Sequence, residues 1–296
     1  VGTGQGARAG ILVKNAEALE RAEKINVLGV DKTGTLTRGE PVVTDLVPLA
    51  LTSDEALRLA AGLEQGSEHP LARAILQRAQ DEGAVLPKVG DFRAVPCKGV
   101  EGSIDGRQLR LGAPAWFPDL ELPQERIAAL QAAGKTVVAL VEDRAALALL
   151  AIADPLRESS RAAVARLKSM GLRVVMLTGD NAATAAAIAS EAGIDDFRAG
   201  ILPGDKAAAV ESLRAAGQIV AMVGDGINDA PALAAADISF AIGAGSDAAI
   251  EAADMTLVRS DLAAIADAIL LSRATLGKIR QNLFFAFIYN VLGIPL

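Results

Sequence analysis

The sequence predicts an α/β fold built on a doubly wound parallel sheet, with an α+β domain inserted into it. Two observations lead to this prediction. Short apolar runs alternate with helical stretches, and one long segment of a different pattern interrupts the alternation. Apolar residues make up 51% of the 296 residues and aromatic residues only 3%, which suits Ala-rich helices packed on short aliphatic strands.

The alternating part consists of buried strands and helices that end at glycine. The runs expected to form strands are residues 26–30, 173–177, 219–223 and 238–242. The helices expected between them are residues 158–170, 182–192 and 206–216. A glycine follows each helix and allows a left-handed C-cap. Strands that alternate with helices predict a parallel sheet covered on both faces.

Residues 39–152 depart from that pattern and predict the inserted domain. Residues 55–63 and 70–80 are expected to be helices. A hairpin is expected over 100–111, closed by Asp105-Gly106, and a second strand pair over 136–152. The chain would leave the α/β domain at 37–41 and return at Asp154-Pro155, and two adjacent crossings make a hinge.

The domain boundaries expected from these patterns divide the chain into four parts. They are the end of a transmembrane or stalk segment at 1–25, an α/β domain at 26–38 and 153–275, the inserted domain at 39–152, and the start of a truncated transmembrane helix at 276–296. The last part is apolar and uncharged from residue 283 onward but shorter than the ~20 residues of a span. The alternative is a buried C-terminal helix.

Charge and cysteine content exclude two classes of protein. The net charge of −7 argues against nucleic acid as a partner, because phosphate binding by proteins needs clustered Lys and Arg. The single cysteine, Cys97, excludes an intrachain disulfide framework.

Polar residues follow three of the predicted strands, and parallel strands bring their carboxyl ends to one edge of a sheet. These residues are Asp31 and Thr33, then Thr178, Gly179 and Asp180, then Asp225, Asn228 and Asp229, with Lys206 opening a helix. Any one acidic residue, such as Asp180 or Asp205, could be a helix N-cap. All of them together favour a site for a phosphoryl group.

The residue types suit phosphoryl transfer. A carboxylate can attack phosphorus to give an acyl phosphate, and Mg²⁺ permits an anionic nucleophile beside an anionic substrate. Lys206 and the Thr178 hydroxyl would hold the equatorial oxygens in the transition state. The glycines would let backbone N–H groups approach the phosphate.

Three segments resemble the signature motifs of P-type ATPases, within the haloacid-dehalogenase-like fold. Residues 31–37 are DKTGTLT, 178–180 are TGD and 224–229 are GDGIND. The resemblance implies that ATP phosphorylates Asp31. It also implies that Asp31, the Thr33 carbonyl and Asp225 hold Mg²⁺, while Asn228 and Asp229 support the site.

Thr33 separates this interpretation from a soluble phosphatase of the same fold. Soluble relatives place a second Asp two positions after the nucleophile as general acid–base, and here Thr33 stands there. The phosphoenzyme should therefore persist long enough to drive a conformational change. The other alternative, a regulatory binding module without catalysis, does not require the nucleophile Asp31.

Residues 67–71, SEHPL, resemble a segment of heavy-metal-transporting P-type ATPases. The resemblance implies nucleotide contacts by Glu64, His69, Gly99 and Gly112. The sequence departs from the family pattern at Cys97, where a glycine is expected, and at Ala113, where an asparagine is expected.

The apolar C-terminal run resembles the seventh transmembrane helix of the Cu(I)-exporting subgroup. Tyr289 and Asn290 would belong to the site of the transported Cu(I) or Ag(I), and the lack of a Lys after Lys278 argues against a Zn/Cd-type pump. The alternative is that the two side chains only satisfy each other between helices.

The resemblance also implies partners that lie outside the sequence. These are the membrane-spanning and actuator domains of the same pump, the membrane itself and a copper chaperone. The chain is then expected to supply the cytosolic domains of an integral protein of the plasma (inner) membrane, able to bind ATP but unable to transport by itself.

Overall fold

The computed structural model describes residues 2–96, 98–225, 229–243, 247–259 and 261–293. Two compact units form within the chain, and each is described by itself. The first comprises residues 1–37, 156–179 and 189–296, and the second comprises residues 38–155 and 180–188.

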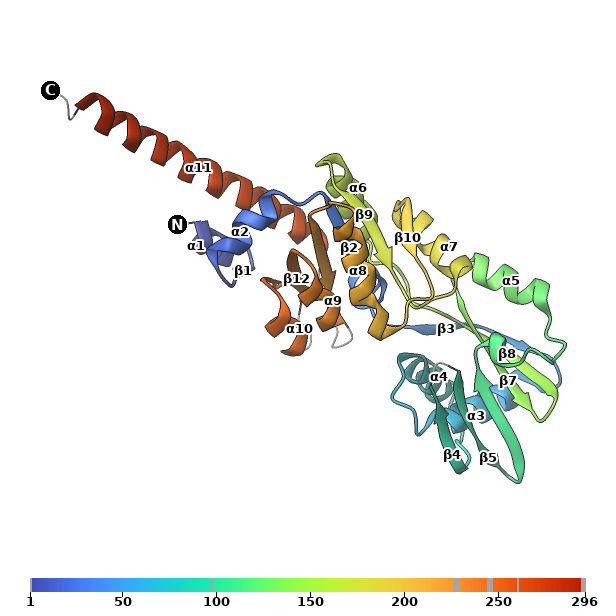
Figure 1. The fold of residues 1–296 in the computed structure, drawn as a ribbon. Helices are drawn as coiled ribbons and strands as arrows, with labels where there is room; N and C mark the ends of the chain where they lie inside the picture. The colour runs from blue at the N-terminus through green and yellow to red at the C-terminus, as the bar shows by residue number, and fades with distance from the viewer. Residues whose placement is uncertain (1, 97, 226–228, 244–246, 260, 294–296) are drawn as a thin grey trace. The chain divides into compact units, whose positions relative to one another are not determined.

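The first unit is built on a seven-stranded sheet with the strand order β1-β13-β12-β11-β2-β9-β10 (Figure 1). Its strands are β1 (Ile11–Val13), β2 (Val27–Asp31), β9 (Arg173–Leu177), β10 (Asp196–Arg198), β11 (Val220–Gly224), β12 (Ile238–Ile242) and β13 (Met255–Leu257). All neighbours are parallel except the edge pair β1 and β13. The four strands predicted from the sequence are β2, β9, β11 and β12, so those predictions are confirmed.

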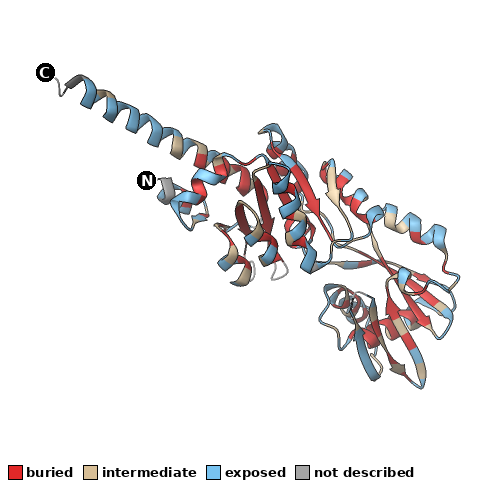
Figure 2. Cartoon of the chain, in the orientation of Figure 1, coloured by how far each residue is buried: buried red, intermediate tan, exposed pale blue. Residues whose placement is uncertain are grey.

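Helices cover both faces of this sheet, and its central strands are buried (Figure 2). The helices of the unit are α1 (Gly2–Arg8), α2 (Ala16–Glu23), α6 (Ser160–Ser169), α8 (Lys206–Ala215), α9 (Ala230–Ala235), α10 (Asp247–Ala252) and α11 (Ala263–Gly293). Val27 of β2 packs in an apolar cluster with Val210 of α8 and Leu233 of α9. Leu28, which points to the opposite face, is also fully buried.

Glycine ends the helices as expected. Gly171, Gly193 and Gly217 have φ angles of 87°, 76° and 77°, in the left-handed region that a β-carbon disfavours. Residues 11–23, which the sequence assigns to a stalk segment, contribute β1 and α2 to the first unit.

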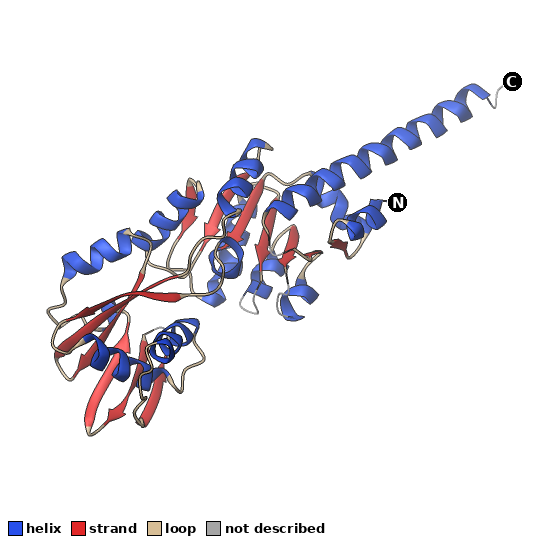
Figure 3. Ribbon diagram, turned by 180° about the vertical axis from the view of Figure 1, so that it is seen from behind, coloured by secondary structure: helices blue, strands red, loops and turns tan. Residues whose placement is uncertain are grey.

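The second unit has a six-stranded antiparallel sheet with the order β3-β8-β7-β6-β5-β4 (Figure 3). Its elements are β3 (Val42–Pro48), α3 (Ser53–Glu64), α4 (Pro70–Asp81), β4 (Gly90–Val95), β5 (Gly99–Ile104), β6 (Arg107–Gly112), α5 (Gln124–Ala132), β7 (Thr136–Glu142), β8 (Ala145–Ala153) and the start of α7 (Ala182–Ala192). Leu57, Leu63 and Ile75 of α3 and α4 pack with Ile104 and Leu140 of the sheet. A second cluster places Ile127 of α5 against other sheet residues.

The predicted hairpin of the second unit is confirmed. Asp105 and Gly106 join β5 to β6 with φ angles of 52° and 81°. Positive φ at both turn residues is the geometry that matches the twist of a two-residue hairpin.

The two crossings between the units are adjacent, as the sequence predicts. Thr37 and Leu156 form an isolated antiparallel bridge, and the Arg38 N–H donates to the Pro155 carbonyl at 3.0 Å. Oδ1 of Asp154 accepts from the backbone N–H groups of Gly39 and Glu40 at 3.0 and 3.2 Å. Each crossing is thus tied to the other by backbone hydrogen bonds.

Helix α11 runs from a packed half to an exposed half. Arg280 donates to both carboxylate oxygens of Glu23 on α2, at 2.9 and 2.7 Å. Beyond it, Leu283, Phe284 and Phe287 are exposed, which contradicts the alternative of a helix buried in this unit. Within residues 2–96, 98–225, 229–243, 247–259 and 261–293, no helix combines the length and apolar character needed to cross a bilayer.

Candidate active site

Three adjacent parallel strands deliver polar residues to one edge of the first sheet. Strand β2 ends at Asp31, which lies beside Leu177 of β9, so Thr178 follows directly at the same edge. Val30 lies beside Val223 of β11, so Asp225 also emerges there. Asp31 and Thr178 are buried. The predicted convergence at this edge is therefore present in the structure.

Lys206, the first residue of α8, links two of the carboxylates. Its Nζ donates to Oδ1 of Asp31 at 2.6 Å and to Oδ1 of Asp229 at 2.7 Å. All three side chains are buried, so water screens these ion pairs little. Removal of Lys206 would leave two desolvated carboxylates facing each other.

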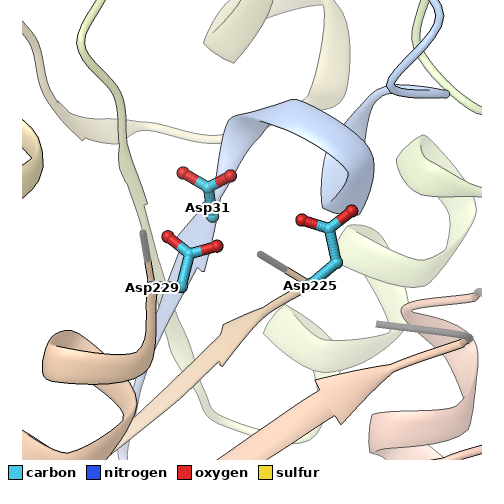
Figure 4. A group of neighbouring side chains, drawn as sticks. All are labelled: Asp31, Asp225 and Asp229. Atoms are coloured by element: carbon cyan, nitrogen blue, oxygen red, sulfur yellow. The ribbon is translucent and has the colours of Figure 1, made fainter. Parts of the chain in front are cut away.

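Asp31, Asp225 and Asp229 gather around one point (Figure 4). One carboxylate oxygen from each lies within 4.8 Å of the others. Magnesium prefers oxygen ligands and binds through one or two carboxylates together with phosphate oxygens. The donor set in the described residues therefore fits Mg²⁺, with Asp31 and Asp225 as the predicted ligands.

Burial and crowding shift the charge balance of the site. Burial, followed by the negative charge of Asp229, raises the pKa of Asp31 from 3.8 to about 7, against the opposing effect of Lys206. Burial and Asp229 also raise the pKa of Asp225. Although burial opposes it, the charges of Asp31 and Asp229 raise the pKa of Lys206. A divalent cation would relieve this repulsion.

Two glycines make room for the carboxylates. A β-carbon at Gly34, whose φ is 73°, would overlap the carboxylate of Asp225. A β-carbon at Gly224 would lie 2.7 Å from Cβ and Oδ2 of Asp229. The sequence interpretation assigned the glycines to close approach of phosphate. The structure gives these two another role, because they let the acidic side chains approach the backbone.

The turn Lys32–Leu36 follows Asp31 and contains Thr33, the other residue that the sequence predicts for the site at the end of β2. Thr33 has an extended conformation and an exposed side chain. Thr37 braces the turn: its Oγ1 accepts from the Gly34 N–H at 3.3 Å and donates to the Lys32 carbonyl at 3.0 Å. The Thr33 carbonyl as a Mg²⁺ ligand remains a prediction.

The remaining predicted residues of the site are placed differently. Asn228 lies outside the described residues. Gly179 ends a segment of the first unit, whereas Asp180 opens a segment of the second, and its role stays a prediction. Asn181 caps α7 by accepting from the Thr184 N–H at 3.0 Å, so Asp180 is not that cap. Asp205 precedes α8 without a side-chain capping bond.

Glu64, the last residue of α3, fits a ligand that donates a hydrogen bond. Its side chain is buried, which raises the pKa of its carboxyl group, while a hydrogen bond from Ser67 has the opposite effect. Its Oε2 is buried and has no hydrogen-bond partner among the described residues. A buried acceptor that no described residue partners suits a ligand group that donates a hydrogen bond.

His69 has a structural role in addition to the predicted one. It is the N-cap of α4, and its Nδ1 accepts from the Leu71 N–H at 3.2 Å, with Pro70 at the first helical position. Partial desolvation lowers the pKa of its imidazole, which favours the neutral ring. Because Nδ1 accepts, Nε2 carries the proton and remains available to a ligand.

Gly99 and Gly112 are neighbours in the pairing of β5 with β6. A β-carbon at Gly99 would lie 2.6 Å from Cα of Gly112, and one at Gly112 would lie 2.6 Å from Cε3 of Trp116. The close strand contact by itself requires both glycines. Their contact with nucleotide stays a prediction, and Cys97 lies outside the described residues.

Tyr289 and Asn290 lie on the exposed half of α11. Tyr289 is 76% exposed, and the Asn290 carboxamide donates to the Ala286 carbonyl at 2.8 Å. Asn290 therefore bonds to its own helix. The role of the pair in ion binding is untested.

The sequence interpretation missed Arg157 and Ser160, which contact the turn after Asp31. Arg157 Nη2 donates to the Gly34 carbonyl at 2.8 Å, and Ser160 Oγ donates to the Leu36 carbonyl at 2.6 Å. Their position directly after Asp154-Pro155, where the chain returns beside its exit, was the signal that could have identified them.

Comparison with known proteins identifies the family. The model of the haloacid dehalogenase-like hydrolase family matches residues 25–237. The probable copper-transporting ATPase PacS of Synechococcus elongatus is 52% identical over all of this chain, which spans 40% of its length. The silver exporting P-type ATPase of Salmonella typhimurium is 47% identical, again over all of this chain and 36% of its own length.

Solved structures give the same result. A zinc-transporting PIB-type ATPase matches 99% of this chain and 49% of its own, with 40% identity and a TM-score of 0.74. The catalytic CPx-ATPase domain CopB-B matches 92% of this chain and 98% of its own, with 30% identity and a TM-score of 0.70.

The fold and the site define a haloacid dehalogenase-like hydrolase, as the sequence predicted. Within that class, the chain belongs to the heavy-metal-transporting P-type ATPases, and it corresponds to their catalytic region.

Removal of the Asp31 charge should stabilise the metal-free chain at high pH. Because the pKa of Asp31 is raised from 3.8 to about 7, folding takes up a proton between those values, and stability falls as pH rises through that window. The gain in melting temperature from Asp31→Asn, measured with a chelator, should be near zero below pH 4 and largest above pH 7. Asp195→Asn, at an exposed position, is the control. A gain that is independent of pH would contradict the assignment.

Proposed function

We propose that the chain is the ATP-hydrolysing catalytic part of a heavy-metal cation pump and that Asp31 carries an aspartyl-phosphate. The observation that supports this most is the buried contact of Lys206 with Asp31 at 2.6 Å, inside the cluster of Asp31, Asp225 and Asp229. A binding module would not need a buried carboxylate held beside a lysine at a strand end.

In the proposed reaction, a carboxylate oxygen of Asp31 attacks the γ-phosphorus of ATP. An oxygen–phosphorus bond forms, the bond from the γ-phosphorus to the β,γ-bridging oxygen breaks, and its electron pair leaves with ADP. Lys206 and the Thr178 hydroxyl hold the equatorial oxygens. Asp31, the Thr33 carbonyl and Asp225 would hold Mg²⁺, which would supply positive charge to offset the repulsion between nucleophile and substrate.

Slow hydrolysis of the acyl phosphate follows from the residue beside Asp31. The exposed Thr33 hydroxyl is a poor general base at neutral pH, in contrast with the Asp expected in a soluble phosphatase. A long-lived phosphoenzyme allows the membrane-spanning and actuator domains expected in the same pump to respond.

In the second unit, Glu64 and His69 bind the nucleotide. Oε2 of Glu64, which no described residue partners, would accept from the adenine amine, and His69, whose lowered pKa favours the neutral ring, would donate from Nε2. Gly99 and Gly112 would border this site. With these parts, residues 39–152 act as the nucleotide-binding domain, and residues 26–38 with 153–275 act as the phosphorylation domain.

The transported ion in this proposal is Cu(I) or Ag(I). Relatives at 52% and 47% identity bear the names of copper and silver pumps, while a structural relative at 40% identity transports zinc, which keeps a zinc-type pump as the alternative. Tyr289 and Asn290 would contribute to the ion site. The chain would then supply the cytosolic domains of an integral plasma-membrane (inner-membrane) protein, with a copper chaperone as a further partner.

Asp31→Asn should abolish phosphorylation from γ-labelled ATP in the full-length pump that contains this chain. The amide is not a nucleophile, so acid-stable, hydroxylamine-labile label should disappear. Asp195→Asn should label like the parent protein. Undiminished label in Asp31→Asn would refute the assignment.

Two substitutions of His69 should separate its capping role from nucleotide binding. Asn caps helices well, so His69→Asn should keep the bond to the Leu71 N–H and the stability of α4, whereas His69→Gln should lose both. Both should weaken ATP use and leave phosphorylation by inorganic phosphate largely intact. Normal ATP affinity in His69→Asn would show that His69 is only a cap.

The ion assignment predicts that Cu(I) and Ag(I) stimulate ATP hydrolysis by the full-length pump more than Zn²⁺ does. Asn290→Ala should reduce that stimulation severalfold, because the carboxamide would no longer contribute to the ion site. Val291→Ala, at an exposed position in the same turn, is the control. Stronger stimulation by Zn²⁺ would favour the zinc-type alternative.

A further inference from the structure

Residues 156–160 form hydrogen bonds with the turn Lys32–Leu36, which follows Asp31. The Arg157 N–H and Ser160 Oγ both donate to the Leu36 carbonyl, at 3.1 and 2.6 Å. The Arg157 guanidinium reaches further along the turn, and its Nη2 donates to the Gly34 carbonyl at 2.8 Å. Arg157 is therefore the contact of this segment nearest to Asp31.

Gly34 lies between Arg157 and the carboxylate cluster. Its carbonyl accepts from Arg157, and its α-carbon is so close to the carboxylate of Asp225 that a β-carbon would overlap it. A displacement of Gly34 would therefore move the backbone against which Asp225 rests. It would also move the carbonyl of Thr33, one residue earlier.

The turn needs a contact of this kind because its own backbone is irregular. Thr33 and Gly34 have non-helical dihedral angles, because ψ of Thr33 is 128° and φ of Gly34 is 73°. Thr37, the residue directly after the turn, bonds to the Gly34 N–H and to the Lys32 carbonyl. Arg157, from a distant part of the chain, bonds to the Gly34 carbonyl. The planar guanidinium suits this task better than an ammonium, because its donors have fixed directions.

We propose that Arg157 is a positioning residue for phosphoryl transfer: by holding the Gly34 carbonyl, it sets the geometry of the Thr33 carbonyl and of Asp225 toward the metal ion. The inference rests on the proposed function. Arg157 acts through Gly34 and does not take part in the bond-making step. Arg157 lies in the segment where the chain returns to the first unit. Its hydrogen bond therefore also connects that segment to the turn Lys32–Leu36.

The test compares Arg157→Ala, Arg157→Lys and Ser160→Ala. Binding of Mn²⁺, used as a spectroscopic substitute for Mg²⁺, is followed on the unphosphorylated chain by electron paramagnetic resonance. Phosphoenzyme formation in the full-length pump is measured against Mg²⁺ and ATP concentration. Thermal unfolding of each variant reports on stability.

We expect Arg157→Ala to weaken Mn²⁺ binding and to raise the half-saturating Mg²⁺ concentration by about tenfold, the effect of losing one ordinary hydrogen bond. Half-saturation by ATP should change by less than about twofold. Arg157→Lys should recover little of the metal affinity, because lysine keeps the positive charge but lacks the planar guanidinium with its fixed donor directions. Ser160→Ala, which acts only on the Leu36 end of the turn, should bind metal normally.

Unchanged metal affinity in Arg157→Ala, or full recovery in Arg157→Lys, would overturn the inference. If Arg157→Ala does not fold, the same measurements are compared between Arg157→Lys and Ser160→Ala. The inference then requires weaker metal binding in Arg157→Lys than in Ser160→Ala. Failure of the parent pump to form a phosphoenzyme would refute the proposed function instead, while Mn²⁺ binding would still report on Arg157.

Discussion

The structure depends on three carboxylates gathered at one end of a parallel sheet, of which Asp31 and Asp229 are buried and Asp225 is partly buried. Lys206 contacts both Asp31 and Asp229, at 2.6 and 2.7 Å, but its single positive charge offsets them only in part, and the pKa of Asp31 is still raised to about 7. The site is therefore held in a state that favours uptake of more positive charge. A divalent cation bound there would reduce the repulsion among the carboxylates.

The structural elements around the carboxylate cluster hold the three side chains in fixed positions despite their mutual repulsion. Parallel pairing of β2, β9 and β11 sets the strand ends, Gly34 and Gly224 allow the carboxylates to approach the backbone, and Thr37 with Arg157 holds the irregular turn. In the second unit, Oε2 of Glu64 is buried and has no hydrogen-bond partner within the described part of the chain, and a desolvated acceptor of this kind favours a ligand that donates.

Much of the fold and the core of the site could be predicted from the sequence because both depend on local patterns. The four central strands are continuous apolar runs, and their polar ends must meet if the strands are parallel. The short strands β1, β10 and β13 have three residues each, too few to show a period. The capping role of His69, the mutual contact of Gly99 with Gly112 and the reach of Arg157 to Gly34 depend on tertiary geometry or strand register. No spacing in the sequence reports these.

The paired crossings at Thr37–Leu156 and Asp154–Gly39 have a consequence for the history of such molecules. Because the exit and the return lie side by side and are joined by hydrogen bonds, a simple sheet domain could acquire or lose the whole inserted module without a change in its own strand order. The entropy of closing the loop would be nearly the same for a short turn as for a complete domain whose ends are already adjacent. The arrangement allows the sheet domain to accommodate a complete second unit at a single point of insertion.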